Sequence, residues 1–83
     1  MKARSRYELN VTRGGRGPAF LAERDRLDRV EVVSLDEGEA IFVWDLPPRR
    51  ARRLVAALRE DLGAMEEAEF VAAWRPAAEQ GRE

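Results

Sequence analysis

The sequence predicts an α+β fold with a small three-stranded antiparallel sheet and two carboxyl-terminal helices on one face of it. Three observations predict this class: a segment of alternating apolar and polar residues, two β-rich runs around a glycine, and apolar residues repeated at intervals of three and four. The expected strands cover residues 5–12, 30–36 and 40–46, and the expected helices cover 48–62 and 65–75. We expect one α+β domain over residues 1–76 and a frayed tail over 77–83.

The first strand is predicted by strict alternation. Tyr7, Leu9 and Val11 alternate with polar residues, so one face of the strand is expected to be buried and the other to be wet. A glycine-rich loop follows at residues 13–18, because its three glycines and one proline favour irregular backbone. Residues 18–27 fit either a short helix, which gives the order βαββαα, or an extended edge segment.

The second and third strands are predicted as a hairpin around Gly38. Runs rich in valine, isoleucine and aromatic residues flank the turn, and the glycine allows its unusual backbone angle. Pairing Leu35 with Ala40 places Val32 opposite Val43, and both faces of the last strand are then apolar. A sheet with helices on one face usually alternates, so we expect a second layer or another copy on the second face.

The two helices are predicted from their boundaries and stripes. Proline at 47 and 48 marks the start of the first, and Gly63 is expected to stop it in the left-handed conformation. Pro76 is expected to end the second. The apolar stripe of the first helix comprises Ala51, Leu54, Val55, Leu58 and Leu62.

Composition excludes several kinds of chemistry. The 83 residues include no cysteine and no histidine, which removes disulfides, thiol nucleophiles and imidazole metal sites. No nucleophile stands beside a base, so we expect no enzyme activity and no cofactor. No apolar run approaches the roughly 20 residues of a membrane span, and we expect a cytoplasmic protein. Arginine greatly outnumbers lysine and alanine is abundant, as is typical of GC-rich bacterial genomes.

Charge is arranged in blocks along the chain. Residues 1–29, 30–48, 49–59 and 60–83 carry net charges of +4, −5, +5 and −5. Such alternation favours neutralisation within the chain or between copies.

The first turns of the helix that starts at Pro48 are rich in arginine, where cations cost roughly 0.3–1 kcal/mol each. Three explanations stay open: pairing with the acids at 36, 37, 39 and 45, an acidic protein partner, or nucleic acid. The candidate contact residues are Arg13, Arg16, Arg49, Arg50, Arg52 and Arg53.

The leading functional hypothesis is a non-catalytic interaction or regulatory module that forms a homodimer through an apolar sheet face. That face is expected to comprise Val30, Val32, Ile41 and Val43. The alternative is a small nucleic-acid-binding regulator that uses the arginine-rich helix start. A helix-turn-helix is disfavoured, because its second helix would present three glutamates to DNA phosphates.

Overall fold

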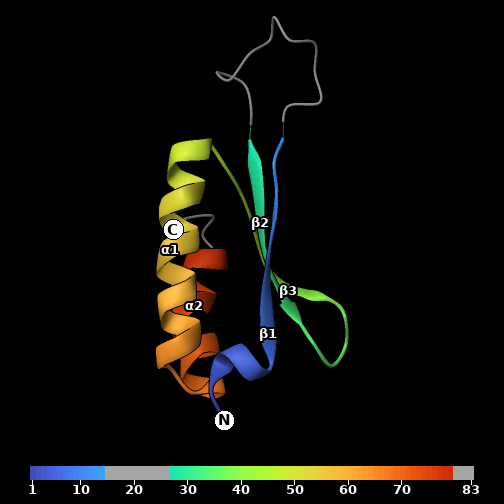
Figure 1. The fold of residues 1–83 in the computed structure, drawn as a ribbon, viewed down its shortest axis with the longest axis vertical. Helices are drawn as coiled ribbons and strands as arrows, with labels where there is room; N and C mark the ends of the chain where they lie inside the picture. The colour runs from blue at the N-terminus through green and yellow to red at the C-terminus, as the bar shows by residue number, and fades with distance from the viewer. Residues whose placement is uncertain (15–26, 80–83) are drawn as a thin grey trace, which may run out of the picture.

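One layer of the fold is a three-stranded antiparallel sheet and the other is a pair of helices (Figure 1). The computed structural model describes residues 1–14 and 27–79. The expected segment at 18–27 therefore lies outside the described residues except for Leu27, and so does Arg16. The elements in chain order are the 3₁₀ turn η1 (Ala3–Ser5), β1 (Tyr7–Thr12), β2 (Asp28–Ser34), β3 (Ala40–Leu46), α1 (Pro48–Ala64) and α2 (Glu67–Glu79).

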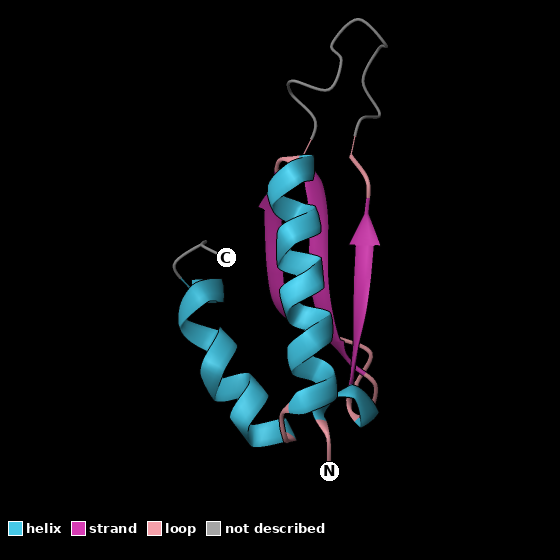
Figure 2. Ribbon diagram, turned by 60° about the vertical axis from the view of Figure 1, so that its left-hand side comes forward, coloured by secondary structure: helices cyan, strands magenta, loops and turns pink. Residues whose placement is uncertain are grey.

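Both helices cover the same face of the sheet, which confirms the predicted fold class. The sheet order is β1-β2-β3, so β1 and β3 are its two edges. Helix α1 contacts all three strands, whereas α2 contacts β3 and η1. Strand β1 reaches α2 at its first residue, where Tyr7 stacks on Phe70, and its other end lies on the side of the sheet away from α2 (Figure 2).

The hairpin register differs by one residue from the prediction. Val30 pairs with Trp44 and Val32 with Phe42, and an irregularity follows between Val32 and Val33. The hairpin closes one residue earlier on both strands than expected, where Ser34 N–H donates to Glu39 O at 2.8 Å. Gly38 occupies the turn at φ 72°, as its position predicted.

This one-residue difference exchanges the faces of β2 relative to β3, since side chains alternate with period two. The buried valines of β2 now share the core with the aromatic residues of β3, beneath the helices. The core comprises Ala3, Val30, Val32, Phe42, Trp44, Leu46, Ala51, Leu54, Leu58, Leu62 and Phe70. At roughly 1.5–3 kcal/mol per buried large apolar side chain, this cluster is the main source of stability.

The second face of the sheet is mixed rather than apolar. One row across the three strands comprises Asn10, Glu31 and Val43. The next comprises Thr12, Arg29 and Asp45. The expected apolar face that joins Val30 and Val32 to Ile41 and Val43 is therefore not formed. An antiparallel sheet of this kind leaves one face in water without a further layer.

Two predicted helix ends also differ. Gly63 is helical and α1 ends one residue later, where Met65 N–H donates to Asp61 O at 2.8 Å. Helix α2 continues through Pro76 to Glu79, and Ala77 and Ala78 pack against the core instead of fraying. Proline has no N–H, so the carbonyl of Ala72, four residues earlier, loses its helical hydrogen bond. This loss is tolerated because Ala72 is exposed to water.

Within the described residues, neither helix is long and apolar enough to cross a lipid bilayer.

Candidate functional site

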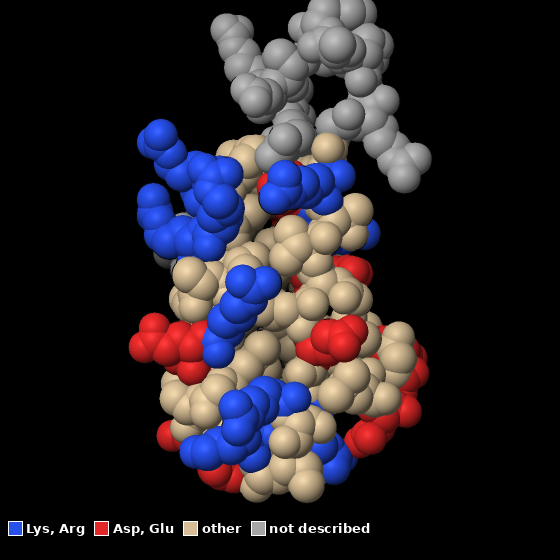
Figure 3. Space-filling model, in the orientation of Figure 1, with Lys and Arg blue, Asp and Glu red and all other residues tan. Residues whose placement is uncertain are grey.

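The arginines predicted as contact residues gather at one end of the molecule. Arg49, Arg50, Arg52 and Arg53 lie exposed at the start of α1, and Arg13 directly follows β1. Figure 1 places the start of α1 beside the end of β1, and Figure 3 shows basic side chains grouped there. We call this region the basic end.

The turn between β2 and β3 lies at the opposite end of the sheet (Figure 1). Asp36 in that turn pairs with Arg6. Asp45 receives hydrogen bonds from Arg29 at 3.0 and 3.3 Å, which raise the pKa of Arg29 above its usual value. The turn acids Asp36, Glu37 and Glu39 thus lie at the end of the sheet opposite to the start of α1, and Asp45 is paired with Arg29. The physical reason is that β3 carries the chain from the turn to the other end before α1 begins.

An open groove of about 500 Å³ lies between the sheet and α1 at the basic end. Three arginines line it, namely Arg13, Arg52 and Arg59, together with Asp28. Its apolar lining comprises Val11, Ala51, Val55 and Ala56. We call it the arginine groove.

Arg59 and Asp28 were missed by the sequence analysis. Arg59 follows Arg52 by seven residues, two helical turns, so the heptad spacing was the signal that both line one side of α1. Asp28 was missed because β2 begins two residues earlier than predicted.

Asp28 closes the sheet end of the groove. It is only 4% exposed, and its carboxylate accepts a hydrogen bond from Gly14 N–H at 3.2 Å. A side chain at Gly14 would place Cβ 1.9 Å from Leu27 O, so only glycine permits this close approach of the two chain segments.

The four residues predicted as a self-association face do not share a face. Val30 and Val32 are fully buried beneath the helices, whereas Val43 on the other face is 40% exposed. Ile41 is partly buried against the edge of the core. The hairpin register causes this separation.

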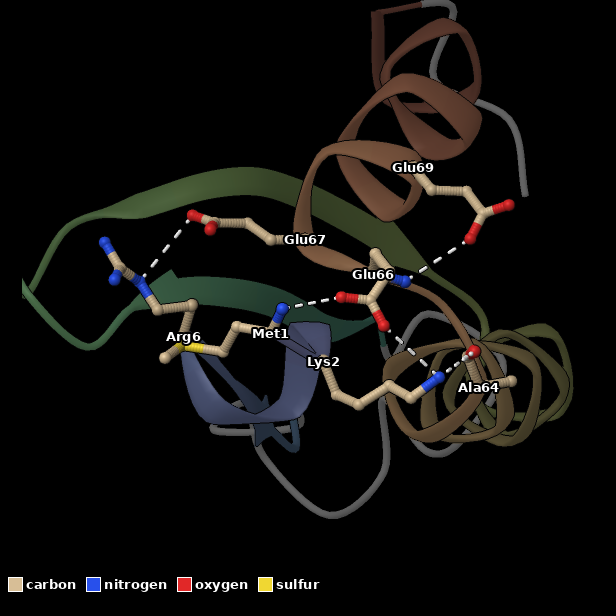
Figure 4. A network of polar contacts seen from close by, with 7 residues as sticks. All are labelled: Met1, Lys2, Arg6, Ala64, Glu66, Glu67 and Glu69. Carbon is tan, nitrogen blue, oxygen red and sulfur yellow. Dashed lines mark hydrogen bonds and ion pairs between the residues drawn. The ribbon is translucent and has the colours of Figure 1, made fainter.

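A second polar cluster joins the amino-terminal segment to the connection between the helices (Figure 4). The Met1 ammonium lies 2.6 Å from Glu66 Oε1, and Lys2 Nζ donates to Ala64 O at 3.0 Å. Arg6 pairs with Glu67 at 3.6 Å. Burial, and then the charge of Glu67, raise the pKa of Tyr7. These contacts tie η1 to α1 and α2, and we assign the cluster a structural role.

The aromatic side chains form a chain of contacts inside the fold. Tyr7 stacks on Phe70, Phe70 meets Trp74, Trp74 meets Trp44 edge-on and Trp44 meets Phe42, with ring centroids 5.9–6.5 Å apart. These rings therefore serve packing between the sheet and α2. None of them lines the arginine groove.

Comparison with known proteins found no matching family model, no matching curated protein and no matching solved structure.

Proposed function

We propose that this chain is a non-catalytic interaction module whose basic end binds an acidic segment of a partner protein. The observation that carries the proposal is the separation of the basic end from the acids of the β2–β3 turn. In the described part of the chain, four arginines of the basic end and the arginine groove form no ion pair: Arg13, Arg49, Arg52 and Arg59.

The start of α1 favours an external anion. Its first turn contains no acidic residue, and its N-cap, Pro47, makes no side-chain hydrogen bond to the helix. The first amides of a helix lack partners within it, and the helix dipole adds positive potential there. Guanidinium groups bind carboxylates through paired, charge-assisted hydrogen bonds. A carboxylate-rich partner would therefore relieve unfavourable charge that the folded chain retains.

Protein is favoured over nucleic acid by the lining of the arginine groove. Proteins that bind single strands stack bases on exposed aromatic rings, whereas this groove is aliphatic and the aromatic rings are in the core.

The proposal is tested by measuring binding of a labelled oligoglutamate by fluorescence anisotropy at about 50 mM salt. Single-stranded and duplex DNA of equal charge serve as competitors. We expect the acidic peptide to bind, the double variant Arg49→Glu/Arg52→Glu to lose that binding, and Arg4→Glu, a matched change on exposed η1, to keep it. Absence of peptide binding, or displacement by DNA at much lower concentration than by unlabelled peptide, would overturn the proposal.

A further inference from the structure

We propose that the acidic partner adds a fourth strand to the sheet, along the outer edge of β1 and over the arginine groove. This inference rests on the proposed function and names the conformation in which the partner binds. Adding a strand to an exposed sheet edge is a general mode of peptide recognition.

The outer edge of β1 has backbone groups available for such a strand. Leu35 N–H donates to Arg6 O at 2.9 Å, so Tyr7 N–H, which lies on the opposite side of the same trans peptide group, points away from β2. Because hydrogen-bonded pairs alternate along an antiparallel ladder, Glu8, Asn10 and Thr12 bond to β2. The N–H and C=O groups of Tyr7, Leu9 and Val11 therefore point outward.

Among the described strands, only β2 pairs with β1. Proteins commonly protect such an edge, because unpaired N–H and C=O groups are a template for another strand. In Figure 2 no described helix or strand lies beyond the upper part of β1 on that side.

The side chains of the same three residues face the helices. Tyr7 and Leu9 are half-buried against the core, and Val11, which is 44% exposed, lines the arginine groove. A strand hydrogen-bonded to this edge would place every second side chain over the groove. Its apolar side chain would cover Val11 and Val55, and its acidic side chains would meet the arginines.

The spacing of the arginines predicts the pattern of the added strand. Arg52 and Arg59 are seven residues apart on α1, or roughly 10 Å along the helix axis. Residues i and i+4 of a strand lie on the same face and are about 13 Å apart, which is the spacing closest to that of the two arginines. Residue i+2 lies between them on that face. The expected pattern is acidic, any, apolar, any, acidic.

A second copy of this chain fits the edge poorly. Symmetric pairing of β1 with β1 is antiparallel, and the side chains that a second β1 would place on the helix face are Tyr7, Leu9 and Val11, none of which is acidic. A second copy would therefore leave the groove arginines without carboxylates. Charge complementarity therefore favours an acidic segment of a different protein.

Two labelled peptides of about eleven residues, a little longer than a typical strand, test the pattern. One has the central sequence Glu-Thr-Ile-Thr-Glu. The other has Thr-Glu-Ile-Glu-Thr, which keeps the composition and charge but places the acids on the face opposite to isoleucine. We expect the first to bind at least about tenfold more tightly, and Val11→Asp in β1 to remove that preference.

Methylation of single peptide amides tests the hydrogen bonds. In antiparallel pairing, the isoleucine amide faces β1 and the threonine amides face solvent. N-methylation at isoleucine should weaken binding by about tenfold, and N-methylation at threonine should change it by less than about threefold.

Each outcome separates the two proposals. Equal binding of both peptides, or indifference to methylation at every position, would overturn strand addition while leaving an electrostatic acidic partner. If neither peptide nor oligoglutamate binds, the proposed function fails as well.

Discussion

Trp74 carries the most specific single contact between the two helices. Its indole Nε1–H donates to Asp61 Oδ2 at 2.9 Å, and its ring packs edge-on against Trp44 with centroids 6.1 Å apart. Both Trp74 and Asp61 are half-buried, so the hydrogen bond joins α2 to α1 where water is partly excluded.

We predict that Trp74→Phe lowers the free energy of unfolding by about 1–2 kcal/mol, because phenylalanine keeps a ring but leaves the carboxylate without its donor. Urea denaturation measures the change. In an Asp61→Ala background the same substitution should cost less. An equal cost in both backgrounds would mean that ring packing, not the hydrogen bond, is responsible.

Glu66 makes stability depend on pH. Its pKa is lowered, first by the hydrogen bond from the Met1 ammonium and then by that from Lys2. A carboxyl group whose pKa falls on folding stabilises the protein at every pH above the pKa of the unfolded state, here 4.5. That contribution is lost as the pH falls through the pKa of the folded state.

Glu66→Gln should therefore lower the urea midpoint near neutral pH, and the difference should shrink once the pH is well below 4.5. Glu60→Gln, a matched change at an exposed position of α1, should have little effect at either pH. A Glu66→Gln effect that persists undiminished in acid would contradict the assignment to charge.

At the scale of the element, α1 combines an effective apolar stripe with an unfavourable amino terminus. Ala51, Leu54, Leu58 and Leu62 are buried as the spacing predicted. Arginines nevertheless occupy the first turn, where the helix dipole disfavours cations.

We predict that Arg49→Glu stabilises the protein by about 1 kcal/mol, since it replaces repulsion with attraction at the dipole. Thermal or urea unfolding at low salt measures the gain, which should diminish in about 1 M salt as charges are screened. Arg59→Glu, nearer to the other end of α1, is the control and should not stabilise. A loss of stability in Arg49→Glu would show that this arginine has a favourable partner in the folded chain.

At the scale of the whole molecule, the register of the hairpin takes Val30 and Val32 out of the sheet face through which self-association was expected. The helices of the same chain cover Val30 and Val32, and the other face sets Val43 and the half-buried Val33 among charged side chains. Burial of a patch with so little continuous apolar surface is weakly favourable.

We predict a molar mass near 9.5 kDa by light scattering over a wide range of loading concentrations. The wild-type chain and Val43→Glu should give the same mass. A stable dimer that Val43→Glu dissociates would instead support the homodimer inferred from the sequence.

Local patterns were enough to predict the elements of this fold, and not enough to predict the candidate site. The start of α1 follows from two prolines, and the Gly38 turn follows from one glycine between β-rich runs. By contrast, the arginine groove joins residues from β1, β2 and α1, and only one of its arginines on α1, Arg52, was expected there. Such a site depends on contacts between distant segments, which no short window of sequence contains.

The sequence by itself determined the types and order of the elements and the apolar stripe of α1, because these depend on backbone preferences and side-chain periodicity within a few residues. The tertiary structure decided the pairing of β2 with β3, the continuation of α2 through Pro76, and the distance between the acidic turn and the basic end. Register and relative position are set by core packing and by where the hairpin closes. A shift of one residue at Ser34 and Glu39 therefore changed which valines are buried, and with them the surface that is left for a partner.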